Sequence, residues 1–137
     1  MPQIRKRYLI DTNIWSHLQR RTTTALVQRF AKLLTGQTFI SPIVLGEMET
    51  GFLKGDRAPQ RRAALDHIYG SSQLLTINKP VAEVYAQLRA HLELAGTPIG
   101  PNDTWIAAEA LHHKMVLVTD NLREFQRVPK LQVENWL

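Results

Sequence analysis

The chain has 137 residues, of which 44% are hydrophobic and 21% are charged, and this length and composition are typical of one folded domain. It contains no cysteine, which excludes disulfides, thiolate zinc sites and cysteine nucleophiles. The formal net charge of +5 favours a polyanionic partner, nucleic acid above all. No apolar run is long enough for a membrane span or a signal peptide, so we expect one soluble, cytoplasmic domain over residues 1–137 that contacts no membrane.

Short apolar runs predict the strands, and apolar residues at helical spacing predict the helices. The predicted strands cover residues 8–10, 38–40, 74–77, 115–119 and 132–134. The predicted helices cover residues 22–34, 41–53, 58–69, 81–96 and 102–113. Because strands and helices alternate along the chain, we expect an α/β fold with a mostly parallel central sheet flanked by helices on both faces.

The ends of several predicted helices are marked by capping residues. Ser41 followed by Pro42 is typical of a helix start, and Asn102 is expected to cap the last predicted helix. Gly70 and Gly96 are expected to end the two helices in between.

Four acidic residues lie where a parallel sheet places its functional side chains. Asp11 directly follows the first strand and Asp120 directly follows the most hydrophobic strand, while Glu47 and Asp103 lie near the starts of two helices. In open α/β sheets, ligands bind beyond the carboxyl ends of the strands. We therefore expect these four carboxylates to converge at one edge of the sheet.

Carboxylates at close range repel one another and raise one another's pKa values unless a cation neutralises them. Ligation by oxygen atoms alone suits Mg²⁺ or Mn²⁺ rather than zinc. Such a cluster binds one or two metal ions that activate a water molecule and stabilise the leaving oxygen of a phosphodiester, and the basic surface of the chain suits that substrate.

Each acid taken alone also has a purely structural interpretation. Asp11 would cap a helix that begins at Thr12, and Asp103 would interact favourably with a helix N-terminus. Glu47 would be a solvated helix residue, and Asp120 a turn residue beside Asn121. The joint placement of the four acids at strand and helix ends favours the functional interpretation.

Four motifs that contain these acids resemble those of PIN-domain nucleases, in the same order and over nearly the whole chain. The second motif carries Met48 where the family usually has leucine. The last motif, with Glu124 and Phe125 after it, is similar to that of the VapC-type toxins of bacterial toxin–antitoxin pairs. The motifs are residues 9–14 (LIDTNI), 41–47 (SPIVLGE, followed by Gly51), 99–108 (IGPNDTWIAA) and 117–121 (LVTDN).

The resemblance implies a divalent-metal-dependent endoribonuclease that acts as the toxin of a toxin–antitoxin pair. It implies that Asp11 and Asp103 are the main metal ligands for Mg²⁺ or Mn²⁺, that Glu47 completes an acidic triad, and that Asp120 assists. The expected supporting residues are Asn13, which would orient Asp11, together with Thr119 and Asn121, which would hold ligand side chains.

The resemblance also implies the partners: an RNA substrate, transfer RNA among the candidates, a homodimer, and a VapB-like antitoxin whose tail enters the acidic pocket. Two alternatives are a PIN nuclease of RNA processing that is not a toxin and a basic RNA-binding module without catalysis. The segment from Phe52 with Arg57, Arg61 and Arg62 is either an RNA-facing edge or an ordinary solvated helix face, and Trp15 is either a core residue or a base-stacking residue.

Overall fold

The structure is a computed structural model that describes residues 5–20 and 23–137. Its strands form one parallel sheet in the order β3-β2-β1-β4-β5. The strands are β1 (Tyr8–Ile10), β2 (Thr38–Ile40), β3 (Gln73–Leu74), β4 (Val116–Val118) and β5 (Val133–Glu134). The predicted α/β fold with a parallel sheet is confirmed.

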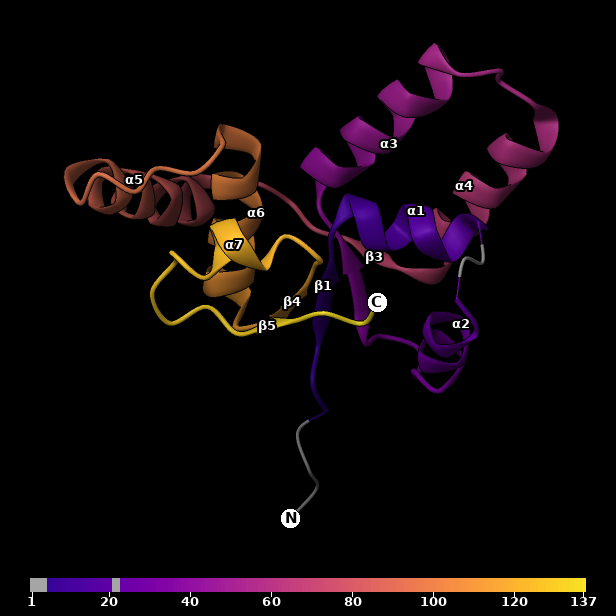
Figure 1. Cartoon of the computed structure of the whole chain (residues 1–137), viewed down its shortest axis with the longest axis horizontal. Coiled ribbons are helices and arrows are strands. Elements are labelled where there is room, and N and C mark those ends of the chain that lie inside the picture. Colours follow the sequence, from indigo (N-terminus) through magenta and orange to yellow (C-terminus); the bar gives the residue numbers. More distant parts are fainter. Residues whose placement is uncertain (1–4, 21–22) are drawn as a thin grey trace.

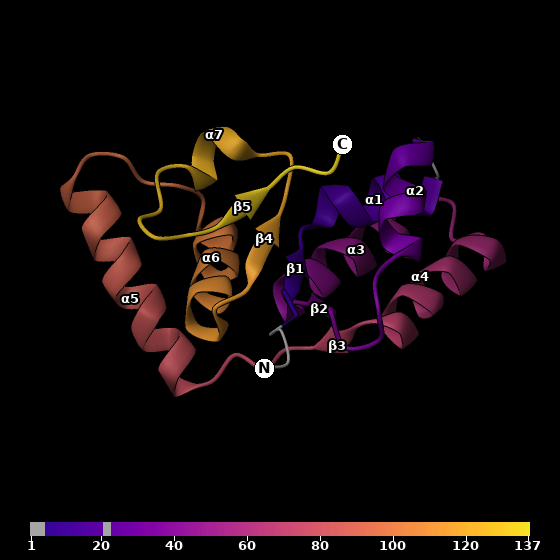
Figure 2. The ribbon, with the colours of Figure 1, turned by 90° about the horizontal axis from the view of Figure 1, so that it is seen from below.

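Helices cover both faces of this sheet, as predicted. Figure 2 shows α5 and α6 on one side of the sheet and α1 to α4 on the other, and Figure 1 shows the same division. No helix of the described residues is long and apolar enough to cross a bilayer. The helices are α1 (Thr12–Arg20), α2 (Thr24–Ala31), α3 (Pro42–Lys54), α4 (Pro59–Ser71), α5 (Lys79–Leu94), α6 (Pro101–His113) and α7 (Leu122–Phe125).

The core forms around the central strands. Every residue of β1, β2 and β4 is buried, as is usual for parallel strands that helices cover on both faces. Helix α6 lies against this core with the small side chains of Ala107, Ala108 and Ala110 fully buried. Because β1 pairs with both β2 and β4, the segments that follow these three strands lie at neighbouring positions on one edge of the sheet.

Several helix starts differ from the sequence prediction, those of α2, α5 and α6 among them. Asn102 does not cap α6: Gly100 is the N-cap residue and Pro101 opens the helix, because proline has the φ angle of a first helical residue and needs no partner for an N–H. Thr23 caps α2 through a hydrogen bond from the backbone N–H of Leu26 to its hydroxyl. The predicted start at Thr22 lies outside the described residues.

Other boundaries differ because the neighbouring elements limit or extend them. The third strand stops at Leu74 rather than Ile77, since its pairing with β2 ends where Ile40 pairs with Leu74. Helix α4 continues through Gly70 to Ser71. The short helix α7, which follows Asn121, has no counterpart in the sequence prediction.

Candidate active site

A cavity of about 440 Å³ lies at the carboxyl edge of the sheet. It brings together side chains from the ends of β1 and β4 and from the beginnings of α3 and α6. All four predicted acids contribute to it, and its lining residues include no basic side chain. These lining residues are Asp11, Thr12, Asn13, Glu47, Asp103, Asp120 and Asn121.

Asp11 is the most buried of the four acids, with 8% of its surface exposed. Its backbone N–H donates to the Val118 carbonyl at 2.9 Å, which fixes it beside the end of β4. The Thr119 hydroxyl donates to Oδ2 and the Thr12 backbone N–H donates to Oδ1, both at 2.8 Å. Burial raises the pKa of the Asp11 carboxyl, these two hydrogen bonds lower it in part, and the charge of Asp120 raises it further.

Asp103 lies in the first turn of α6 and has the largest perturbation among these acids. Burial, contact with Glu124, and the charges of Asp11, Glu124 and Glu47 raise the pKa of its carboxyl to about 7. The Asn121 side-chain amide donates to Asp103 Oδ2 at 3.4 Å and to Glu124 Oε2 at 3.3 Å. The amide of Asn121 therefore lies between two carboxylates.

Glu47 and Asp120 complete the acidic lining. Burial and the charge of Asp11 raise the pKa of Glu47. The side-chain amide of Asn13 donates to both carboxylate oxygens of Asp120, at 3.0 and 3.2 Å. The prediction that Asn13 orients Asp11 is therefore wrong, because the start of α1 directs Asn13 toward Asp120 in the segment after β4. The Thr119 hydroxyl holds Asp11 instead.

Glu124 is the residue that the site prediction omitted. It lies in α7, and it is joined to Asp103 through Asn121. The sequence contained a signal, because Glu124 was part of the matched final motif, but the motif did not predict the helix that turns this residue back toward α6.

The site has the donor chemistry of a hard-cation site, although its side chains are not gathered around a single point. Within the described residues, no three acidic or histidine side chains are close enough together to hold one ion. Carboxylates without a counter-charge repel one another, and the raised pKa values of Asp11, Glu47 and Asp103 follow in part from that repulsion.

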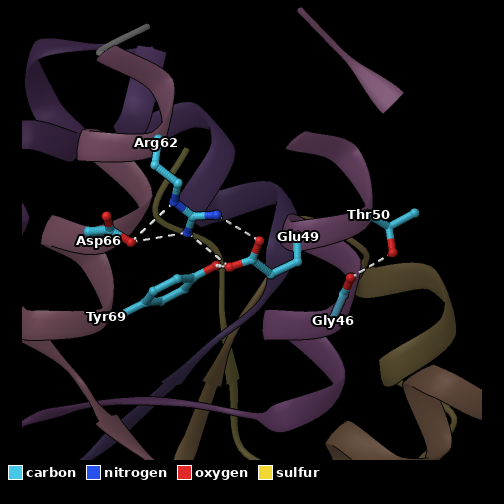
Figure 3. A network of polar contacts seen from close by, with 6 residues as sticks. All are labelled: Gly46, Glu49, Thr50, Arg62, Asp66 and Tyr69. Carbon is cyan, nitrogen blue, oxygen red and sulfur yellow. Dashed lines mark hydrogen bonds and ion pairs between the residues drawn. The ribbon is translucent and has the colours of Figure 1, made fainter. Parts of the chain in front are cut away.

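The residues predicted to face RNA differ in their exposure and in their contacts. Arg62 is half-buried and paired with acids of the protein: its guanidinium donates to both oxygens of Glu49 at 2.8 and 2.9 Å and also contacts Asp66 (Figure 3). Arg57 and Arg61 are exposed. Trp15 is only 1% exposed and packs against Phe30, so it is a core residue and does not stack on a base.

The chain matches known proteins over nearly all of its length. Residues 8–131 match the family model described as PIN domain. The chain is 33% identical over 130 residues to ribonuclease VapC2 of Rickettsia felis, a match that covers 94% of this chain and 97% of that protein. It is 34% identical over 131 residues to the tRNA(fMet)-specific endonuclease VapC of Salmonella typhimurium, with coverages of 95% and 98%.

The fold is also that of a solved complex. The crystal structure of DNA-bound VapBC from Salmonella typhimurium superposes with a TM-score of 0.89 at 32% identity, and the match covers 97% of this chain and 100% of that one. The names of these relatives and the fold shared with the VapBC complex together favour a ribonuclease toxin over a non-catalytic RNA-binding module or a nuclease of RNA processing. The chain belongs to the PIN-domain family and, within it, to the VapC-type ribonucleases of toxin–antitoxin pairs.

Proposed function

We propose that this chain hydrolyses RNA phosphodiester bonds with Mg²⁺ or Mn²⁺ held by Asp11, Glu47, Asp103 and Asp120. The observation that carries the proposal is that four carboxylates from four separate segments line one cavity whose lining has no basic side chain. Such an arrangement is unfavourable for a folded protein by itself, since like charges destabilise one another at short range. A bound divalent cation removes that penalty.

The donor set fits a hard cation. All candidate ligands are oxygen atoms, which Mg²⁺ and Mn²⁺ prefer. When bound, the metal supplies an activated water and neutralises charge on the phosphate. Asp11 is the best-positioned ligand, because two hydrogen bonds fix its carboxylate before any cation arrives. Asp103 and Glu47 supply further negative charge from the neighbouring helices.

The polar neighbours act as positioning residues in this proposal. Thr119 is fully buried, and its hydroxyl donates to Asp11 and also accepts the backbone N–H of Asn121 at 3.0 Å. Asn121 in turn lies between Asp103 and Glu124, and Asn13 holds Asp120. Asp11, Asp103 and Asp120 thus each have a neutral hydrogen-bond donor that limits the rotation of the carboxylate and leaves its charge available.

Transfer RNA is the proposed substrate class, because one relative is named as a tRNA(fMet)-specific endonuclease and the net charge of +5 favours a large polyanion. We further propose that a VapB-like antitoxin inhibits this chain by placing an arginine in the acidic cavity, and that the chain forms a homodimer. An arginine guanidinium can bridge two carboxylates, and it would occupy the place of the metal without any change in the toxin fold.

The test is metal-dependent cleavage by the purified protein. We expect cleavage of a transfer RNA pool in Mg²⁺ or Mn²⁺, its loss in excess chelator, and its recovery when the metal is restored. Sequencing the new 5′ ends would locate the cut. Cleavage that persists in chelator would contradict the metal assignment, and absence of cleavage of any cellular RNA would contradict the function.

A further inference from the structure

A second cavity, of about 500 Å³, lies between α1, α3 and α4. It shares Thr12 and Glu47 with the acidic cavity, so the two cavities are neighbours with two lining residues in common. We call this second cavity the side groove. Its lining residues are Thr12, Ser16, Gln19, Arg20, Glu47, Met48, Gly51, Phe52, Gln60, Arg61, Ala64 and Leu65.

The side groove differs from the acidic cavity in its chemistry. Three of its side chains, those of Ser16, Gln19 and Gln60, are hydrogen-bonding groups that make no hydrogen bond within residues 5–20 and 23–137. Each glutamine amide presents a donor and an acceptor side by side, which is the pattern that the edge of a nucleobase requires. The groove therefore offers uncommitted recognition groups beside the proposed catalytic carboxylates.

Positive charge and apolar surface complete this lining. Arg20 and Arg61 are exposed at the groove. The one ion pair of Arg61 in the described chain, with Asp56 at 3.7 Å, is between two exposed side chains, and such pairs are weak enough to exchange for a phosphate. Phe52, which is half-buried, contributes apolar surface of the kind against which an unstacked base packs.

One wall of the groove is held in place by the network in Figure 3. Glu49 in α3 accepts hydrogen bonds from Arg62 and from the Tyr69 hydroxyl in α4. The Arg62 guanidinium lies over the Phe52 ring, 4.9 Å from its centre. This network ties α3 to α4, so the spacing between the residues that the two helices contribute to the groove is fixed before a ligand binds.

We propose that the side groove binds an unpaired nucleobase of the RNA next to the scissile phosphate, with Gln19 and Gln60 reading the base edge and Arg20 and Arg61 holding its phosphate. This inference rests on the proposed nuclease function and names its specificity-determining residues. The volume of about 500 Å³ lies within the roughly 300–1,000 Å³ of small-ligand sites. The positive charge at the groove favours a nucleotide over an acidic or purely apolar ligand.

The experiment compares short single-stranded RNAs that differ only in the base next to the cleaved bond. We expect wild-type protein to favour one base by about tenfold, the discrimination that one good base-edge contact supplies. The double variant Gln19→Ala/Gln60→Ala should lose most of this preference, because its rate on the favoured RNA should fall toward its rate on the others. Gln87→Ala, an exposed glutamine of α5 outside both cavities, is the matched control and should behave as wild type.

A binding measurement separates failure of the groove from failure of the nuclease assignment. In chelator, the wild-type protein should bind the favoured oligonucleotide more tightly than the others, and the side-chain amide NMR signals of Gln19 and Gln60 should shift on binding. An unchanged base preference in the double variant would overturn the proposal. If that variant also resisted its antitoxin, the groove would bind protein rather than RNA.

Discussion

Two glutamates of α3, only two residues apart, lie in opposite electrostatic environments. Glu49 faces Arg62 and Tyr69 of α4, and hydrogen bonds from the arginine lower the pKa of its carboxyl. Glu47 faces the acidic cavity, where burial and the charge of Asp11 raise its pKa. One helix thus carries an acid with a counter-charge and an acid of the candidate site without one, and the missing counter-charge is the feature that distinguishes the candidate site.

The largest effect on the RNA cleavage rate should come from removing one carboxylate charge from the acidic cavity, compared with removing one from the environment of Glu49. Asp103→Asn takes a carboxylate from the acidic cavity and should lower the RNA cleavage rate about a thousandfold, because metal-assisted stabilisation of the reacting phosphate is worth several kcal/mol. Asp11→Asn should act in the same direction. Initial rates in Mn²⁺, with a melting curve for each variant, measure this effect.

Glu49→Gln is the matched control for that experiment, since it removes an acid from the same region without touching the cavity. Its cleavage rate should stay within about threefold of wild type, as expected for a group remote from the reacting atoms. A wild-type rate in Asp103→Asn, after removal of contaminating nuclease, would contradict the assignment of the site.

Another acid without a counter-charge, Glu109, lies outside the acidic cavity on the buried side of α6 and affects stability. It is fully buried, and neither of its oxygens has a well-placed hydrogen-bond partner within the described chain. Burial raises the pKa of Glu109 from 4.5 to about 7, and the Ser41 hydroxyl offsets only part of that rise. The unfolded chain therefore releases this proton at lower pH than the folded chain, and stability falls as the pH rises from 4.5 through 7.

Glu109→Gln should remove this loss. Urea unfolding from pH 4.5 to 8 should show the variant gaining on wild type by up to about 3 kcal/mol, since one pKa unit corresponds to about 1.4 kcal/mol. The difference between the two proteins cancels the contributions of Asp11 and Asp103, whose raised pKa values act in the same direction. Parallel pH profiles for the two proteins would show that Glu109 keeps its ordinary pKa.

Metal should stabilise the acidic cavity and have no effect at the Glu49 network. At a concentration 100-fold above Kd, Mg²⁺ or Mn²⁺ should raise the melting temperature by about 5–10 °C, because binding at that saturation adds about 2.7 kcal/mol. The shift should shrink strongly in Asp103→Asn and persist in Glu49→Gln. Equal shifts in all three proteins would place the bound cation outside the cavity.

The sequence predicted the acidic cavity better than it predicted the contacts within it. Strand ends are visible in the apolar pattern, so the convergence of Asp11, Glu47, Asp103 and Asp120 followed from the parallel sheet alone. The partner of Asn13 did not follow, because it depends on the direction in which α1 leaves the sheet. Glu124 was missed for a different reason, since α7 is too short to show a helical period in the sequence.

The same limit applies to the basic residues of the α3–α4 region. Charge alone grouped Arg61 and Arg62 as RNA-facing residues, although adjacent residues on a helix point about 100° apart. Arg62 points at Glu49, while Arg61 lies at the side groove. Composition predicts that a helix is basic, but only the packing of α4 against α3 decides which of its arginines remains available for a ligand.

The smallest expected effect concerns the Glu49 network. Because Arg62 lowers the pKa of Glu49 below its ordinary value of 4.5, the pair stabilises the fold above that pH and its contribution is lost as the pH falls through the lowered pKa. Arg62→Gln should therefore unfold at lower urea than wild type at pH 7, and the gap should close as the pH falls from 4.5 through the lowered pKa of Glu49. Arg89→Gln, which breaks the exposed Arg89–Glu93 pair of α5, is the control and should give a smaller gap. The expected change in stability is opposite in sign to that at Glu109: at high pH, Arg62→Gln destabilises the fold and Glu109→Gln stabilises it. A gap for Arg62→Gln that stays constant down to pH 3 would mean that the arginine stabilises α3 and α4 by stacking on Phe52 and Tyr69 rather than by its charge.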